Sequence, residues 1–212
     1  MPEADIRRYH CTVASFGSWA YSRRCLWVSW AALVVCGSLF VDPCRAPATD
    51  PAPTEYQVKA AYLLNFAKYV EWPASALDGP TAPFVIGVLG QDPFGADLDK
   101  MVASRSINHR PIVVKRLATD AEAKGCQILF IGASESFRFG GIRETLKELP
   151  ILTVADTESS VESGGVISFV RKENKVRFQV NLNAARARQL TISSRLLSVA
   201  ESITGKTEGG RK

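Results

Sequence analysis

The chain has 212 residues, of which 46% are hydrophobic and 22% are charged, and its formal net charge is +5. This composition is typical of a folded globular protein and excludes wholesale disorder. The mild positive charge is far from that of a nucleic-acid-binding protein, so we expect no nucleic-acid partner. The length permits one domain with a substantial core, or two small domains.

Cysteine and histidine are distributed unevenly along the chain. Four of the five cysteines lie before residue 45, which leaves Cys126 alone in the rest of the sequence. This excludes a disulfide within a domain that begins after residue 45, and also a metal site built from several cysteines. The two histidines, His10 and His109, are too few for most histidine-based metal or catalytic clusters. We therefore predict neither a metal ion nor a cofactor.

The amino-terminal part of the chain has the features of a targeting segment. Residues 25–41 (CLWVSWAALVVCGSLFV) form an uncharged segment of 17 residues directly after two arginines. Small residues follow at 46–48 (APA), and this combination is typical of a secretory signal peptide. We predict that residues 1–48 are a signal peptide with a long amino-terminal region, cleaved after Ala48. The alternative is a retained membrane anchor, because 17 apolar residues reach the short end of a membrane span.

The remaining chain is expected to form one folded domain. Residues 49–53 form a short proline-rich linker. The folded domain is predicted to span residues 54–205, and residues 206–212 form a polar tail.

The first half of the domain alternates between helical and extended patterns. A helix is expected to begin at a capping box made by Thr54 and Gln57 and to continue to about Glu71, before Pro73. It carries so many apolar residues that we expect it to be mostly buried. The elements expected after it are, in chain order, a strand at 84–89, a helix from Asp92 or Pro93 to about 103, a strand at 111–117, a helical turn at 119–124, a strand at 127–131, a helix around 142–149 and a strand at 151–155.

The second half predicts a β-hairpin followed by helices. Residues 166–170 are apolar, and polar and apolar side chains alternate along residues 176–182. A helix from Asn183 or Ala184 and a final helix ended by Gly205 complete the domain. Because strands separated by helices favour a parallel sheet, the predicted fold class is α/β. We expect a mixed, mainly parallel sheet with helices on both faces and an antiparallel C-terminal hairpin.

Two loops approach known functional motifs without completing them. Residues 87–95 (GVLGQDPFG) follow a strand, as a phosphate loop would, but they match neither glycine-rich motif and carry Asp92. Residues 132–136 (GASES) lack the second glycine of a nucleophile elbow. We therefore expect a tight turn in the first loop and helix capping by Ser134 or Ser136 in the second.

Two further side chains have a functional and a structural interpretation. Cys126 begins a predicted buried strand, so a structural thiol is expected; the alternative in an exported protein is a disulfide between two chains. His109 would be the available base for a serine nucleophile. We expect it instead to be a solvated loop residue, because it lies in the loop before the strand at 111–117.

Five arginines in the last third of the chain are candidates for partner binding. Arg171 and Arg177 belong to the hairpin, whereas Arg186, Arg188 and Arg195 belong to the segments after it. Such charges usually form a solvated face, and the alternative is a patch that docks an acidic partner or membrane headgroups. We hypothesise that this region contacts a partner, with the hairpin serving as an edge for strand addition or dimerisation.

Several stretches are, as an ordered set, similar to one known family. They are residues 58–73 (VKAAYLLNFAKYVEWP), 87–95 (GVLGQDPFG), 126–131 (CQILFI), 165–169 (GVISF), 176–178 (VRF) and 192–197 (ISSRLL). On these residues the chain from about Glu55 to Ile203 resembles the YfiR family of periplasmic regulators (YfiR/HmsC-like).

This resemblance implies a small α/β domain in the periplasm that regulates rather than catalyses. In the best-known member the domain represses a membrane-bound diguanylate cyclase, and an OmpA-like outer-membrane lipoprotein can sequester the repressor. The resemblance therefore implies an inner-membrane sensor or diguanylate cyclase as partner, a lipoprotein of that type as a second partner, and effects on cyclic di-GMP and biofilm formation. That member also contains disulfides linked to redox sensing, and this feature is not carried over because only Cys126 is available here.

The sequence thus leaves two classes of function open, and neither is an enzyme. The first is a regulatory protein that binds a membrane sensor, either as a monomer or as a homodimer. The second is a sensor that holds a small molecule at the carboxyl ends of the parallel strands. Residues 90–92 and 132–134 are expected at two such strand ends.

Overall fold

The computed structural model describes residues 52–77, 79, 81–157, 160 and 164–205. The chain divides into two units, residues 1–50 and residues 51–212, and the described residues belong to the second. The predicted signal peptide and the polar tail lie outside the described residues, as does most of the predicted linker.

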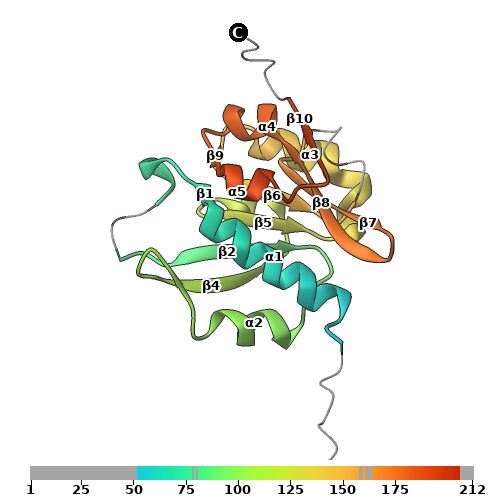
Figure 1. The fold of residues 1–212 in the computed structure, drawn as a ribbon. Coiled ribbons are helices and arrows are strands. Elements are labelled where there is room, and N and C mark those ends of the chain that lie inside the picture. Colours follow the sequence, from blue (N-terminus) through green and yellow to red (C-terminus); the bar gives the residue numbers. More distant parts are fainter. Residues whose placement is uncertain (1–51, 78, 80, 158–159, 161–163, 206–212) are drawn as a thin grey trace, which may run out of the picture. The chain divides into compact units, whose positions relative to one another are not determined.

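An eight-stranded sheet forms the centre of the described domain (Figure 1). Its strands are, in spatial order, β10 (Ser202–Thr204), β8 (Lys175–Asn181), β7 (Ile167–Lys172), β6 (Leu152–Ala155), β5 (Ile128–Ile131), β2 (Phe84–Leu89), β4 (Arg110–Leu117) and β3 (Ser106–Ile107). The β7–β8 and β4–β3 pairs are antiparallel, and the other neighbours are parallel. The predicted mixed, mainly parallel sheet with an antiparallel C-terminal hairpin is therefore confirmed.

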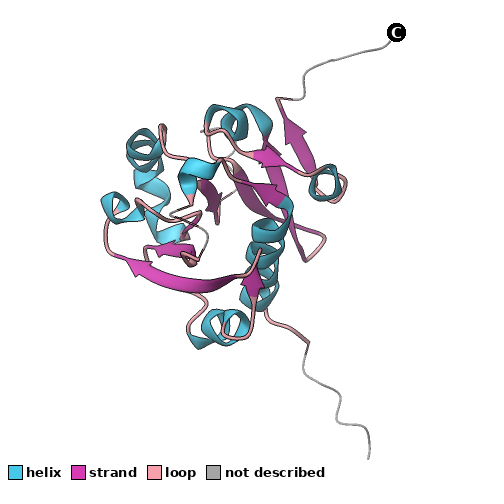
Figure 2. Cartoon of the chain, turned by 90° about the vertical axis from the view of Figure 1, so that its left-hand side faces the viewer, coloured by secondary structure: helices cyan, strands magenta, loops and turns pink. Residues whose placement is uncertain are grey.

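Helices cover both faces of this sheet, as predicted (Figure 2). The α-helices are α1 (Glu55–Tyr69), α2 (Ala96–Val102), α3 (Phe139–Leu146), α4 (Leu182–Ala187) and α5 (Ser194–Leu197). The 3-10 helices are η1 (Ala74–Ala76), η2 (Asp120–Ala123) and η3 (Ala133–Arg138). A small second sheet pairs β1 (Val70–Glu71) with β9 (Thr191–Ile192), which joins the end of α1 to the C-terminal segment.

The two faces carry separate hydrophobic cores because successive strand residues point to opposite faces. Ile86 of β2 and Phe130 of β5 belong to the core under α1 and α2, whereas Leu89 and Leu129 belong to the core under α3. The larger core, on the α1 side, is rich in aromatic rings. Phe66 of α1 is fully buried there, with its ring edge against a ring of the β7–β8 hairpin at a centroid distance of 5.1 Å.

The start of α1 forms as the sequence predicts. Thr54 Oγ1 accepts a hydrogen bond from Gln57 N, and Gln57 Oε1 accepts one from Thr54 N in return. This capping box satisfies two of the amide groups that a helix leaves unpaired at its start. The helix ends at Tyr69 rather than Glu71, because the next two residues pair with β9.

The C-terminal segment differs from the sequence-based prediction. A final helix reaching Gly205 was expected, but α5 ends at Leu197 and residues 202–204 form β10. Ile203 and Thr204 are β-branched and suit a strand that covers the edge of β8. The hairpin is consequently not the edge of the sheet along its whole length, because β10 pairs with Gln179–Asn181.

The chain reverses its direction across the sheet at β2. From β2 it passes through α2 to β4 on one side, and from β5 it passes through α3 to β6 on the other. Because α2 and α3 cover opposite faces, the loops after β2 and β5 diverge. In open α/β sheets such a switch point creates a crevice at the carboxyl ends of the strands, where ligands commonly bind.

Candidate functional site

A polar cleft of about 230 Å³ lies at this switch point, and we call it the strand-end cleft. Its walls come from the loops after β2, β5 and β6 and from the first turn of α1. The lining residues are Tyr56, Gln91, Asp92, Pro93, Ala133, Ser134 and Asp156. The two loops that the sequence placed at strand ends, 90–92 and 132–134, thus lie together in the structure.

A short polar contact holds these two loops together. Gln91 N donates a hydrogen bond of 3.0 Å to Ser134 Oγ, and Gly132 N donates one of 3.0 Å to Leu89 O. Gly90 has φ +88°, and a Cβ atom there would lie 2.5 Å from Ser134 Oγ. Only glycine fits this position without strain, because other residues rarely adopt that backbone angle and would also clash. Ser134 therefore ties the loops together and does not serve as a nucleophile elbow.

Asp92 is held at the cleft by an arginine from the neighbouring strand β4. Arg116 Nε donates to Asp92 Oδ2 at 2.9 Å, while its two terminal nitrogens bind both carboxylate oxygens of Asp99 in α2. These hydrogen bonds lower the pKa of Asp99 and raise that of Arg116. Asp92 Oδ1 also accepts from Phe94 N at 2.8 Å, so the loop turns before α2 begins at Ala96 rather than at the predicted 92 or 93.

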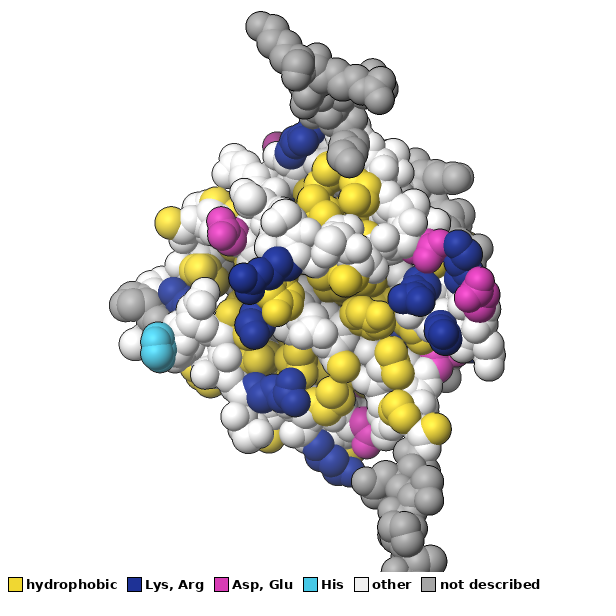
Figure 3. All heavy atoms as spheres, in the orientation of Figure 1, with side chains coloured by type: hydrophobic (Ala, Val, Ile, Leu, Met, Phe, Trp, Pro, Cys, Tyr) yellow, Lys and Arg dark blue, Asp and Glu magenta, His cyan; other side chains and the backbone are white. Residues whose placement is uncertain are grey.

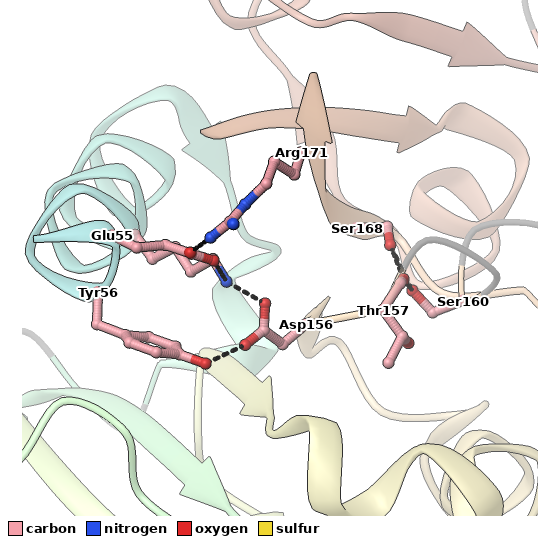
Figure 4. A network of polar contacts seen from close by, with 8 residues as sticks. Glu55, Tyr56, Asp156, Thr157, Ser160, Ser168 and Arg171 are labelled. Carbon is pink, nitrogen blue, oxygen red and sulfur yellow. Dashed lines mark hydrogen bonds and ion pairs between the residues drawn. The ribbon is translucent and has the colours of Figure 1, made fainter. Parts of the chain in front are cut away.

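Asp156, which lines the cleft, forms a buried ion pair with Lys59 of α1, and Figure 4 shows the polar network around Asp156. Lys59 Nζ lies 2.5 Å from Asp156 Oδ1, and both side chains are only 7% exposed. Tyr56 OH donates to Asp156 Oδ2 at 3.2 Å, and Lys59 also pairs with Glu55 at 2.6 Å. Burial, followed by the Asp156 charge, raises the pKa of Tyr56. Glu55 extends the network by pairing with Arg171 of the hairpin.

Sequence reasoning did not find Lys59 or Asp156. The available signal was a lysine on a helix face otherwise made of apolar residues, since a buried lysine requires a partner. The partner lies 97 residues away and follows β6, so only the sheet topology brings the two together.

A second hollow, of about 470 Å³, lies between α1 and the tip of the β7–β8 hairpin, and we call it the hairpin groove. Its lining residues are Pro53, Glu55, Val58, Tyr62, Arg171, Asn174, Lys175, Val176 and Arg177. It shares Glu55 with the ion-pair network of Figure 4, so α1 forms a wall of both hollows.

The five predicted arginines do not gather at one place. Arg171 and Arg177 line the hairpin groove. Arg186 and Arg195 are exposed on α4 and α5, outside the lining of that groove. Arg188 is 5% exposed, donates to Ala184 O at 3.2 Å, and has its pKa lowered by burial. A buried arginine cannot meet a partner without rearrangement, so among these five the structure leaves four at the surface.

Cys126 and His109 occupy positions remote from the strand-end cleft. Cys126 is 4% exposed just before β5, and burial raises the pKa of its thiol. It is buried as expected, and a disulfide between chains would require this end of the strand to open. His109 lies in the turn between β3 and β4, at the amino end of β4. Because Ser134 follows the carboxyl end of the parallel strand β5, His109 cannot serve as its base.

The described residues show neither a metal-binding cluster nor a membrane-spanning helix. That part of the chain contains no cluster of three or more His, Cys, Asp or Glu side chains suited to a metal ion. None of its helices is both long and apolar enough to cross a membrane.

The sequence matches the model of one protein family, described as YfiR/HmsC-like, over residues 56–201. The match covers more than half of the chain, and the protein belongs to this family. The matched residues include all the lining residues of both hollows apart from residues 53 and 55. A comparison with curated proteins finds no match.

Two solved structures show partial similarity. A conserved domain protein from Vibrio cholerae is 17% identical with a TM-score of 0.44, over 57% of this chain and 54% of that one. The ABC domain in complex with L-Trp from Streptococcus pneumoniae is 12% identical with a TM-score of 0.46, over 70% of this chain and 60% of that one. The chain therefore spans little more than half the length of either, and the family match remains the informative comparison.

Proposed function

We propose that the protein is an exported regulator that binds a membrane-bound diguanylate cyclase, or a similar inner-membrane sensor, and holds it inactive. The observation that carries the proposal is the family match over residues 56–201. The YfiR/HmsC-like family is one of periplasmic regulators, and its members regulate rather than catalyse. Loss of the protein would then raise cyclic di-GMP and promote biofilm formation, and an OmpA-like outer-membrane lipoprotein would relieve the repression.

The test is deletion of the gene in its own organism, with cellular cyclic di-GMP as the readout. The proposal expects a rise that is reversed by the full chain. A chain that lacks residues 25–48 should not reverse it, because the predicted signal peptide would be missing. An unchanged cyclic di-GMP level in the deletion strain would contradict a role as repressor of a cyclase.

A second candidate function, a small-molecule sensor, is favoured by the strand-end cleft. Residues 91–93, 133–134 and 156 converge there at the topological switch point of the sheet, which is the usual ligand position in such folds. Buried polar groups with fixed geometry are also the usual means of orienting a small ligand.

Thermal unfolding of the purified chain in the presence of amino acids, sugars and polyamines tests this second candidate. A ligand that binds the folded state raises the melting temperature, and the stabilisation grows with the logarithm of the ligand concentration relative to its dissociation constant. Substitution of Asp156 by Asn should abolish such a shift. A shift that is unaffected by this substitution would place the ligand elsewhere.

A further inference from the structure

The hairpin groove combines an apolar wall with two basic side chains that have no counter-ion among the described residues. Val58 and Tyr62 of α1 and Val176 of β8 supply the apolar lining, and all three are partly exposed. Within the described part of the chain, Lys175 and Arg177 form no ion pair, and we call these two residues the groove cations. An apolar surface bordered by uncompensated charge is typical of a recognition site.

The remaining charges around the groove largely neutralise one another. Arg171 pairs with Glu55 inside the groove, and Lys172 pairs with Glu201 at its rim. Glu173, in the turn of the hairpin, is the other acidic residue of this region. The groove cations alternate with Val176 along β8, so their side chains border the groove from the other side of the strand, where Lys172 also lies. They therefore leave this border positively charged, and a segment that pairs with the β8 edge can direct alternate side chains toward the apolar wall and toward the groove cations. Figure 3 shows this face, where apolar side chains gather across the middle and basic side chains border them.

The open part of the β8 edge adds backbone hydrogen-bonding groups. β10 pairs with β8 at Gln179–Asn181, and Phe178 O accepts a hydrogen bond from Glu201 N on the same edge. Alternate residues of an antiparallel strand direct their backbone groups toward the same edge. The N–H and C=O groups of Val176 therefore face this edge beyond the end of β10, where an extended segment can pair with them.

We propose that the hairpin groove binds an extended acidic segment of a partner protein. An apolar side chain of that segment packs against Val58 and Tyr62, and its carboxylates meet the groove cations. The inference rests on the proposed function and deepens it, because it gives the regulator a surface for its partner. A second copy of this chain is a poorer occupant, since it would bring the same cations toward the groove.

Selection of short random peptides on the chain purified from the periplasm tests this inference directly. We expect the enriched peptides to combine Asp or Glu with a large apolar residue. The double variant Lys175→Glu/Arg177→Glu should bind them at least about tenfold more weakly, because each reversal replaces attraction with repulsion. Lys175 opposes Lys172 across the hairpin, so its reversal removes a like-charge pair and should preserve the fold.

Two matched variants complete the test. Val58→Ser should weaken binding by reducing the apolar wall, whereas Arg105→Glu reverses an exposed charge outside the groove lining and should leave binding within about twofold. Enrichment of neutral or basic peptides, failure to select any peptide, or equal binding by the groove variants would each overturn the inference.

The same variants separate this inference from the proposed function. If the wild-type chain lowers cyclic di-GMP in the deletion strain and the groove variants lower it equally, the groove is not the docking surface. The proposed regulatory function is then retained. If acidic peptides bind the groove but the wild-type chain has no effect on cyclic di-GMP, the docking surface stands and its partner is not a cyclase.

Discussion

The strand-end cleft and the hairpin groove share helix α1 as a wall but differ in how their polar groups are used. In the cleft, Asp92 and Asp156 are each held by a basic side chain, and hydrogen bonds tie the loops together. In the groove, Lys175 and Arg177 have no counter-ion among the residues described. A preorganised polar cleft suits a small molecule, whereas an open apolar groove with uncompensated charge suits a segment of another chain.

The largest expected effect comes from the residue that anchors the shared helix. Phe66 is fully buried, lines neither hollow, and packs against the rings of Phe169 and Phe178. Phe66→Ala should lower the free energy of unfolding by about 3–5 kcal/mol, because it leaves a cavity in the aromatic core. Urea unfolding measures this loss. A cost below about 1 kcal/mol would show that α1 does not depend on this contact.

Breaking the ion pair between the two hollows should have the next largest effect. Lys59→Met leaves Asp156 buried with Tyr56 as its remaining partner, and we expect a cost of about 3 kcal/mol. The double variant Lys59→Met/Asp156→Asn should cost less than the sum of the two single variants, because it leaves no uncompensated charge. Additive losses in urea unfolding would contradict this coupling.

A matched pair of glycines tests how tightly the cleft is closed. Gly90 and Gly125 have nearly the same φ, +88° and +87°, but a Cβ atom clashes with Ser134 and Glu135 only at Gly90. Gly125→Ala should cost about 1 kcal/mol from backbone strain alone. Gly90→Ala should cost about 1–2 kcal/mol more and should reduce any ligand-induced thermal shift, as overpacking moves the loops. Equal melting temperatures for the two variants would show that the loops after β2 and β5 shift at little cost to make room for the added methyl group.

The smallest effect is expected at the opposite end of the sheet, at Cys126. Burial raises the pKa of this thiol above its ordinary value of 9.0, so its contribution to stability is complete below pH 9.0. The contribution is lost as the pH rises through the raised pKa, because the unfolded chain releases the proton first. The wild-type free energy of unfolding should therefore fall more steeply above pH 9.0 than that of Cys126→Ala. Parallel pH profiles would contradict the burial effect.

Local patterns predicted the elements whose stability is decided locally or by burial. The capping box at Thr54 and Gln57, the buried strands and the alternating hairpin all follow from short-range periodicity. The segment at 202–204 was predicted as helix, because its strand conformation depends on the edge of β8 that it covers. Its three residues are too few for a period to distinguish strand from helix.

The sites were harder to predict because they combine residues from distant parts of the chain. The loops at 90–92 and 132–134 were correctly placed at strand ends, and the structure joins them in one cleft. Lys59 and Asp156 required the sheet order to be known, because nothing local links them. The burial of Arg188 was also hidden, since an arginine after a short helix is normally solvated.

The most direct test of the account is cyclic di-GMP in the deletion strain carrying the wild-type chain, Lys175→Glu/Arg177→Glu or Arg105→Glu, at matched periplasmic levels. The account predicts that the wild-type and Arg105→Glu chains restore a low level and that the groove variant does not. A level that the wild-type chain leaves unchanged would contradict the regulatory function itself.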